Sequence, residues 1–81
     1  MDERVQNIIE ALEELMQDQA VPKNVKQRIE KSIFYLKDTT DLSISVNKAL
    51  SELDEIADDT NMESYTRTQI WNVVSMLEMI R

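Results

Sequence analysis

Apolar residues recur every three or four positions along most of this chain, a spacing that places them on one face of an α-helix. Four segments carry the pattern, and short stretches of turn-forming residues separate them. They predict helices at about residues 3–18, 22–37, 43–57 and 63–80. Val, Ile and Thr do not alternate with polar residues over the length of a strand. We therefore expect an all-α fold in one domain, residues 1–81.

Each predicted helix has one apolar face. Pro22 fits the first position of the second helix, because its missing N–H would be unpaired there anyway. The clearest connectors are residues 38–41 and 58–61, which are rich in Asp, Thr and Asn. The residues expected to face the core are Val5, Ile8, Ile9, Leu12, Leu15, Met16, Val25, Ile29, Ser32, Ile33, Leu36, Val46, Ala49, Leu50, Leu53, Ile56, Ile70, Val73, Val74, Leu77 and Ile80.

The two halves of the chain resemble each other. A shift of 41 residues aligns identical apolar residues, namely Val5 with Val46, Leu12 with Leu53, Ile29 with Ile70 and Leu36 with Leu77. A duplication explains this, and so does the general similarity of two amphipathic hairpins of equal length. Either origin gives two αα-hairpins, each with one apolar side to bury. The sequence thus predicts a four-helix bundle.

The fourth predicted helix carries more apolar surface than a bundle needs. Tyr65, Met76 and Met79 lie away from its core face, and Trp71 lies at the flank of that face. Met and aromatic residues are enriched at the centres of association surfaces. The four residues are therefore the candidate interface, and a two-fold homodimer is its simplest form.

Composition excludes several kinds of chemistry. The chain has no Cys and no His, which removes thiol nucleophiles, disulfides and the usual zinc sites. It has no Gly, which removes phosphate-binding loops. Every Asp and Glu is expected on a polar face or in a turn, where no apolar pocket tunes a carboxyl group for acid–base catalysis. We expect no enzymatic activity and no cofactor.

The acidic turn at residues 54–63 resembles the start of a calcium-binding loop, because Asp59, Asn61 and Glu63 alternate along it. The turn-forming glycine of such a loop is replaced by Ser64, and its closing glutamate by Ile70. We expect a solvated acidic turn and no metal site.

The net charge of −7 is unevenly distributed. Residues 1–18 carry −5, residues 22–37 carry +4 and residues 38–63 carry −7. Lys23, Lys26, Lys37 and Phe34 lie on the outward side of the second helix, and basic residues around an aromatic ring are typical of a nucleic-acid contact. The alternative is an ordinary surface on which lysines pair with neighbouring acids and Phe34 covers a helix seam. The acidity of the whole chain favours this second interpretation.

Several short runs are similar to a family of small archaeal proteins, uncharacterised protein family 0147. They are residues 21–26, Leu42-Ser43, Asn47-Lys48-Ala49, Asn61-Met62 and the most specific one, Arg67-Thr68-Gln69-Ile70-Trp71-Asn72. The resemblance covers essentially the whole chain. The chain departs from the family at Glu63, where the family often has proline, so the resemblance does not fix the start of the last helix. The resemblance implies a four-helix bundle of bromodomain-like, up-and-down arrangement in an archaeal cytoplasm, and it implies no activity.

Taken together, these features favour a non-enzymatic module for protein association or self-association. Nucleic-acid or ribonucleoprotein binding through the second helix is the alternative. The chain starts without a basic segment followed by an apolar one, which favours the cytoplasm, and no apolar run reaches membrane-spanning length. A pair one turn apart, Arg67 and Trp71, is expected either to close an edge of the bundle or to form a cation–π contact.

Overall fold

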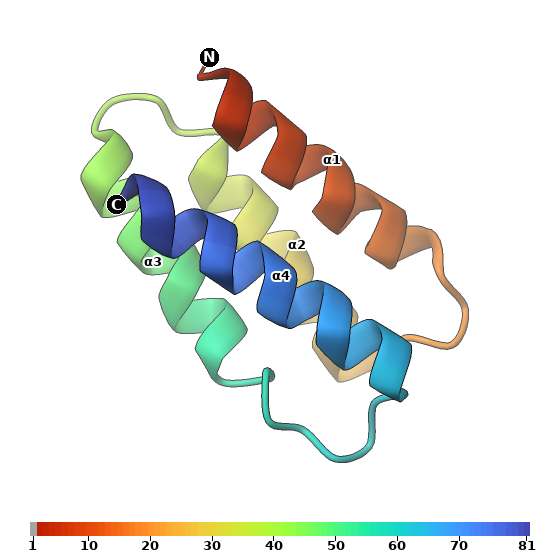
Figure 1. The fold of residues 1–81 in the computed structure, drawn as a ribbon. Helices are drawn as coiled ribbons and strands as arrows, with labels where there is room; N and C mark the ends of the chain where they lie inside the picture. Colours follow the sequence, from red (N-terminus) through yellow and green to blue (C-terminus); the bar gives the residue numbers. More distant parts are fainter. Residues whose placement is uncertain (1) are drawn as a thin grey trace.

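The computed structural model describes residues 2–81, in which four helices and no strand occur (Figure 1). The helices are α1 (Glu3–Gln17), α2 (Lys23–Leu36), α3 (Leu42–Asp54) and α4 (Ser64–Ile80). Each helix packs on two neighbours, in the cyclic order α1, α2, α3, α4, and the backbones of diagonal pairs stay apart. This confirms the predicted all-α four-helix fold, whereas the bromodomain-like detail stays a prediction. None of these helices has both the length and the hydrophobicity to cross a membrane.

Side chains cap two of the helices at their N-termini. Asp2 accepts a hydrogen bond from the backbone N–H of Arg4 at 2.8 Å, and Asp41 accepts one from that of Ile44 at 3.2 Å. Each cap satisfies a backbone N–H that has no partner within its helix. The helices α2 and α4 begin without such a cap, at Pro22 and Glu63.

Two predicted boundaries need correction. Pro22 is not the first residue of α2 but its N-cap, because its ψ of 152° is extended while its carbonyl accepts the N–H of Lys26. The third helix ends at Asp54 and not near residue 57. Beyond it the N–H groups of Ile56 and Ala57 both turn back onto the carbonyl of Leu53, which closes a tight turn that buries both side chains.

One hydrophobic core runs between the four helices. Nearly all of the expected core residues are buried, whereas Met16 and Ile80 are only partly buried and pack against its edge. The connections add three side chains that the helical pattern did not include, Val21, Ala57 and Met62. The pairs related by the 41-residue shift occupy matching core places, since Leu12 and Leu53 are both 0% exposed, as are Ile29 and Ile70. These residues of the sequence repeat are therefore equally buried in the core.

Three polar side chains are buried in this core, and two of them are satisfied. Ser32 donates a hydrogen bond to the carbonyl of Arg28, and Ser45 donates one to the carbonyl of Asp38. The hydroxyl of Thr66, on a residue that is 1% exposed, has no partner among the described residues. A hydroxyl removed from water without a partner costs free energy.

We expect Thr66→Val to raise the free energy of unfolding by about 1 kcal/mol, because valine keeps the shape of threonine and removes the unpaired hydroxyl. The matched variant Ser32→Ala removes a hydroxyl that is paired and should lower it by ~0.5–1.5 kcal/mol. Urea denaturation followed by circular dichroism measures both changes. A loss of stability in Thr66→Val would show that its hydroxyl is satisfied in solution.

Candidate functional site

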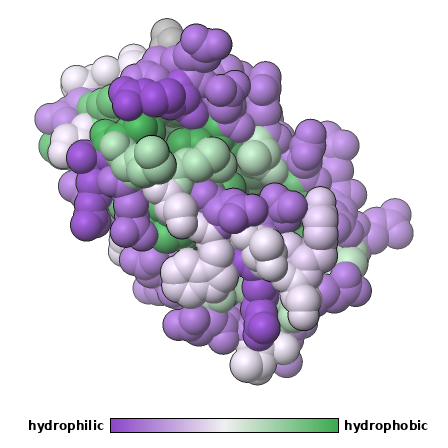
Figure 2. Space-filling view, viewed as in Figure 1, coloured by the Kyte–Doolittle hydropathy of each residue, from purple (hydrophilic) through white to green (hydrophobic). Residues whose placement is uncertain are grey.

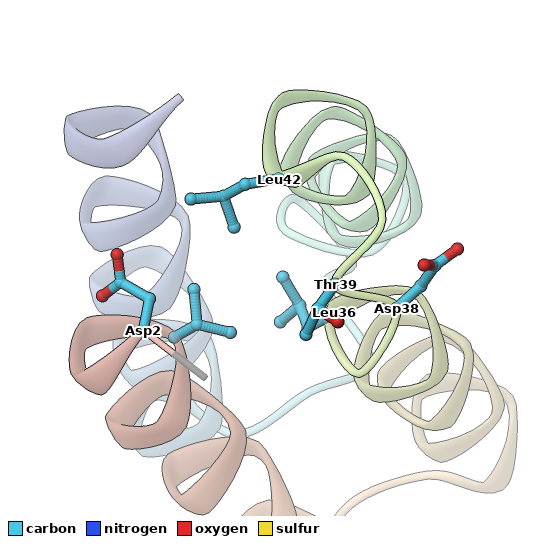
Figure 3. A pocket seen from close by; sticks show the side chains of 6 residues that line it. Asp2, Leu36, Asp38, Thr39 and Leu42 are labelled. Atoms are coloured by element: carbon cyan, nitrogen blue, oxygen red, sulfur yellow. The ribbon is translucent and has the colours of Figure 1, made fainter.

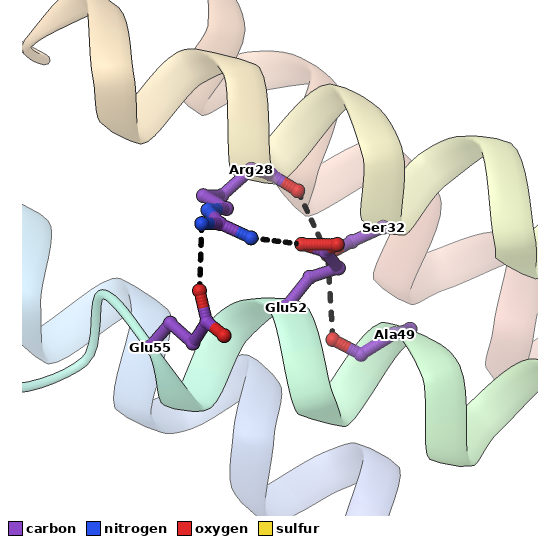
Figure 4. Close-up of polar contacts among 5 residues, drawn as sticks. All are labelled: Arg28, Ser32, Ala49, Glu52 and Glu55. Atoms are coloured by element: carbon purple, nitrogen blue, oxygen red, sulfur yellow. Dashed lines mark hydrogen bonds and ion pairs between the residues drawn. The ribbon is translucent and has the colours of Figure 1, made fainter.

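The seam between α2 and α3 is the closest helix contact in the bundle. Small side chains meet there, because Ser32 and Ala49 are both fully buried in it. The hydroxyl of Ser32 lies 3.4 Å from the carbonyl oxygen of Ala49, so the two backbones approach closely at this point (Figure 4). Small residues at facing positions permit this approach, since side chains set the distance between helix axes.

An ion-pair cluster closes one end of the same seam. The guanidinium of Arg28 on α2 lies 2.8 Å from the carboxylate of Glu52 and 2.7 Å from that of Glu55, as Figure 4 shows. The hydrogen bond to Glu52 raises the pKa of Arg28 above its usual value, and the charge of Glu55 adds to this effect. The side chain of Glu52 is only 14% exposed, so the expectation that every acid lies on a polar face or in a turn is wrong for Glu52. It lies in the seam because Arg28 balances its charge.

The other end of the α2–α3 seam is covered by Tyr35 and Lys48. The ammonium group of Lys48 lies 5.6 Å from the centre of the Tyr35 ring, within the range of a cation–π contact. The Tyr35 ring also meets the ring of Phe34 edge-on, with 5.9 Å between centroids. Small residues and the ion-pair cluster thus close the centre and one end of this seam, whereas a hollow of about 140 Å³ remains at the end where Tyr35 and Lys48 lie.

The seam between α1 and α4 is the counterpart of this one under the 41-residue shift, and it is built differently. The places of Ser32 and Ala49 are taken by the larger Val73 and Ile8. Larger side chains set a wider spacing between helices, and α1 and α4, like α3 and α4, pack far less extensively than α2 and α3. The ion-pair cluster is missing as well, because Gln69 stands where Arg28 would be and Ala11 where Glu52 would be. The α1–α4 seam is therefore open, and each of its ends has a hollow.

The first hollow, which we call the methionine hollow, has a volume of about 190 Å³ and lies where α1 begins and α4 ends. Its lining residues are Arg4, Asn7, Ile8, Met76, Met79 and Ile80. Met79 is 83% exposed and Met76 is 38% exposed, so both methionines lie at the surface. Figure 2 shows the hydrophobic colour gathering in a band along this seam. The result is an apolar concavity on an otherwise polar face.

Arg4 borders the methionine hollow with its charge already balanced. Its guanidinium lies 2.9 Å from the carboxylate of Asp2. Hydrogen bonds from the Arg4 side chain and then from its backbone N–H lower the pKa of Asp2 to about 2. The pair therefore stays ionised near neutral pH and adds no net charge to the rim.

The candidate interface residues do not form one continuous surface. Met76 and Met79 lie together in the methionine hollow, whereas Tyr65 borders the second hollow of the same seam, about 260 Å³ in volume, with Gln69 and Ala11. Tyr65 and Met76 are eleven positions apart, or roughly 16 Å along the helix. Trp71 lies on the opposite flank of α4, toward the end of α3. The structure thus brings only the two methionines together.

Trp71 and Arg67 share a polar hollow of about 300 Å³, which is lined by Ala57, Asp58, Ser64, Arg67, Thr68 and Trp71. The indole is 45% exposed. No cation–π contact joins Arg67 to Trp71, and among residues 2–81 the contact of this type is that of Lys48 with Tyr35. The cation–π alternative is therefore wrong, and the pair lines an open hollow beside the end of α3.

The lysines of α2 lie at the surface, and no lysine forms an ion pair within the described part of the chain. Lys23 and Lys37 are exposed, and Lys26 is half-buried. Phe34 is 73% exposed and does not cover a helix seam. Neither feature of the ordinary-surface interpretation, lysines paired with acids or a ring covering a seam, is present here. Nucleic-acid binding at this face stays a prediction.

The carboxylates do not converge on a common point. In the acidic turn Glu55 pairs with Arg28, and Asp59 accepts the N–H of Asn61 at 2.9 Å. Among residues 2–81, no three acidic side chains gather closely enough to hold a metal ion. A further hollow of about 210 Å³ at the end of the bundle is bordered by Asp2 and Asp38, and Figure 3 shows both carboxylates pointing away from its apolar centre. The backbone N–H of Thr40 lowers the pKa of Asp38 below its usual value.

Sequence reasoning did not identify the residues that make the two seams different. Arg28 counted only as one of several bases, Ala11 had no expected role, and Gln69 and Lys48 appeared only within the runs that resemble the family. A signal was available, because the 41-residue shift pairs Ser32 with Val73 and Ala49 with Ile8. Such unequal pairs in an otherwise matching core predict one tight seam and one loose seam.

Comparison with known proteins identifies similar chains in archaea. A model of an uncharacterised protein family, UPF0147, matches residues 1–80. A UPF0147 protein of Thermococcus kodakarensis is 37% identical over the full length of both chains, and one of Metallosphaera sedula is 41% identical over 96% of this chain and 89% of its own. The crystal structure of a UPF0147 protein from Thermoplasma acidophilum matches with a TM-score of 0.90 at 33% identity, over 96% of this chain and 93% of its own. That of MMP1188, a protein of unknown function, also gives a TM-score of 0.90, at 37% identity, over 96% of this chain and 90% of its own.

The acidic turn provides a test of the expected absence of a metal site. Millimolar Ca²⁺ or Mg²⁺ should leave the melting temperature where NaCl of equal ionic strength leaves it, because only specific binding stabilises by mass action. Thermal unfolding followed by circular dichroism measures this. A saturable rise of several degrees with either cation, and its loss in Asp59→Asn, would establish a site.

Proposed function

The chain belongs to the uncharacterised protein family UPF0147, and we propose that it is a non-enzymatic association module whose contact surface is the methionine hollow. The observation that carries the proposal is the open α1–α4 seam. Two exposed methionines, Met76 and Met79, lie beside Ile8 and Ile80 around a concavity of about 190 Å³. Exposed apolar surface of this kind marks an interaction site more often than it serves the monomer.

The contrast with the α2–α3 seam supports this proposal. The same fold closes the centre and one end of that seam with Ser32, Ala49 and the ion pairs of Arg28, so a seam open along its length is not a requirement of the architecture. Methionine side chains are flexible and polarisable, which suits them to pack against a partner's side chains. An apolar concavity surrounded by polar groups also has the usual anatomy of an interface.

A second copy of the chain is the partner that we propose, in the archaeal cytoplasm. The relatives named above are archaeal proteins that match this chain over nearly all of its length. Apolar burial has to supply the affinity, because each copy carries a net charge of −7 and two copies repel at long range.

We expect sedimentation equilibrium to show reversible self-association of the wild type and a monomer for Met76→Glu combined with Met79→Glu. The variant places unpaired carboxylates in the contact, which should weaken association at least ~100-fold. Ile44→Glu is the matched control, because Ile44 is a 53%-exposed apolar residue on α3, far from the seam. It should associate as the wild type does.

The same experiment can contradict the proposal in two ways. A wild type that stays monomeric at high concentration and recovers no partner in pull-downs would rule out association. Equal weakening by the methionine substitutions and by Ile44→Glu would mean that general surface hydrophobicity, and not the methionine hollow, drives it.

A further inference from the structure

Phe34 is the large aromatic side chain that most clearly lacks cover. It lies on the outward edge of α2 and is 73% exposed. One edge of its ring meets Tyr35, and the rest faces solvent. Lys31 and Lys37 are three positions before and after it, so they flank the ring on the same side of the helix. Phe34 is thus an apolar projection with a basic surround, in which Glu30 is the acid one turn away.

The methionine hollow has the opposite character. It is concave and apolar, and its volume of about 190 Å³ exceeds the roughly 150 Å³ at which an apolar cavity can hold a benzene ring. Methionine sulfurs make favourable contacts with aromatic rings. On α1, exposed Glu3 and Glu10 lie one turn to either side of Asn7, a residue of the hollow. Asp2 balances the charge of Arg4, which also lines the hollow, so the net charge of this edge of α1 is negative.

From this match of shape and charge, we infer that Phe34 of one copy inserts into the methionine hollow of a second copy. The inference rests on the proposed self-association and specifies which surface of the partner fills the hollow. In the contact, the lysines beside Phe34 face the acidic edge of α1. A two-fold pairing of two methionine hollows would instead bring Glu3 and Glu10 of both copies near each other, and like charges at an interface are unfavourable.

This contact joins two different surfaces. Phe34 is on the outward edge of α2, the hollow is between α1 and α4, and α2 lies diagonally across the bundle from α4. One pair of copies therefore cannot satisfy both contacts at once, because the two surfaces face different directions. Such a head-to-tail contact repeats and gives a ring or an open chain of copies. Wild-type protein should grow beyond a dimer as its concentration rises.

Mixing two variants tests the inference. Phe34→Gln removes the aromatic projection, and Met76→Glu with Met79→Glu places unpaired carboxylates in the hollow. Each variant alone should be monomeric, whereas an equimolar mixture should give a complex with the mass of two chains, because one intact projection meets one intact hollow. Light scattering coupled to size exclusion measures the masses. Trp71→Gln is the control, because Trp71 lies on the opposite flank of α4 from the hollow, and it should assemble like the wild type.

Folding is checked by circular dichroism, and Met79→Glu alone serves as a second hollow variant if the double one unfolds, since Met79 is 83% exposed. If Phe34→Gln self-associates like the wild type while the methionine variant does not, the hollow is a contact surface but Phe34 does not fill it. A mixture that stays monomeric overturns the inference as well. A monomeric wild type overturns the proposed function with it.

Nucleic acid is the other occupant to be tested at Phe34. Fluorescence anisotropy with labelled oligothymidylate should show no binding that Phe34→Gln abolishes. Salt-sensitive binding that requires Phe34, together with a mixture that does not assemble, would assign this face to single-stranded nucleic acid and overturn the inference.

Discussion

The close approach of α2 to α3 is the contact on which the rest of the bundle depends. It is possible because Ser32 and Ala49 are small and fully buried where the two helices meet. Arg28 then fixes the approach with charge-assisted hydrogen bonds to Glu52 and Glu55. With no disulfide to hold the chain and no glycine to shape its turns, this tight pair provides the rigid half of the fold.

The open α1–α4 seam results from unequal residues at positions that the internal repeat makes equivalent. Val73 and Ile8 are too large to allow the approach that Ser32 and Ala49 permit, and Gln69 cannot bridge the helices as Arg28 does. The apolar stripe of α4 is therefore only partly covered from within the chain. Met76 and Met79 remain at the surface because the seam beside them was not closed, and this is the physical basis for assigning them to a partner.

Much of the fold could be predicted because it depends on a local signal. The spacing of Val5, Leu12, Leu53 and Leu77 identifies core faces without any knowledge of how the helices pack. Helix ends are less predictable, because Pro22 and the turn after Asp54 are placed by one or two hydrogen bonds each. The free energy of each of these hydrogen bonds is small compared with that of burying the apolar residues.

The candidate site was predictable only in part, for a different reason. Helical spacing shows that Tyr65, Trp71 and Met76 point away from the core, but it does not show which neighbouring helix each one meets. That depends on the bundle, which places Trp71 beside the end of α3 and Met76 beside α1. The sequence shows that Phe34 has basic neighbours. It does not show that Phe34 matches a hollow on another face of the molecule.

The methionines themselves offer the most direct measurement of the central claim, that the open α1–α4 seam is a contact surface. Their methyl groups, labelled with ¹³C, can be followed by NMR over a dilution series. Met76 and Met79 should shift or broaden as concentration rises, while Met62, which is buried beneath the turn before α4, should stay unchanged. Constant resonances for Met76 and Met79 across the whole series would contradict the account.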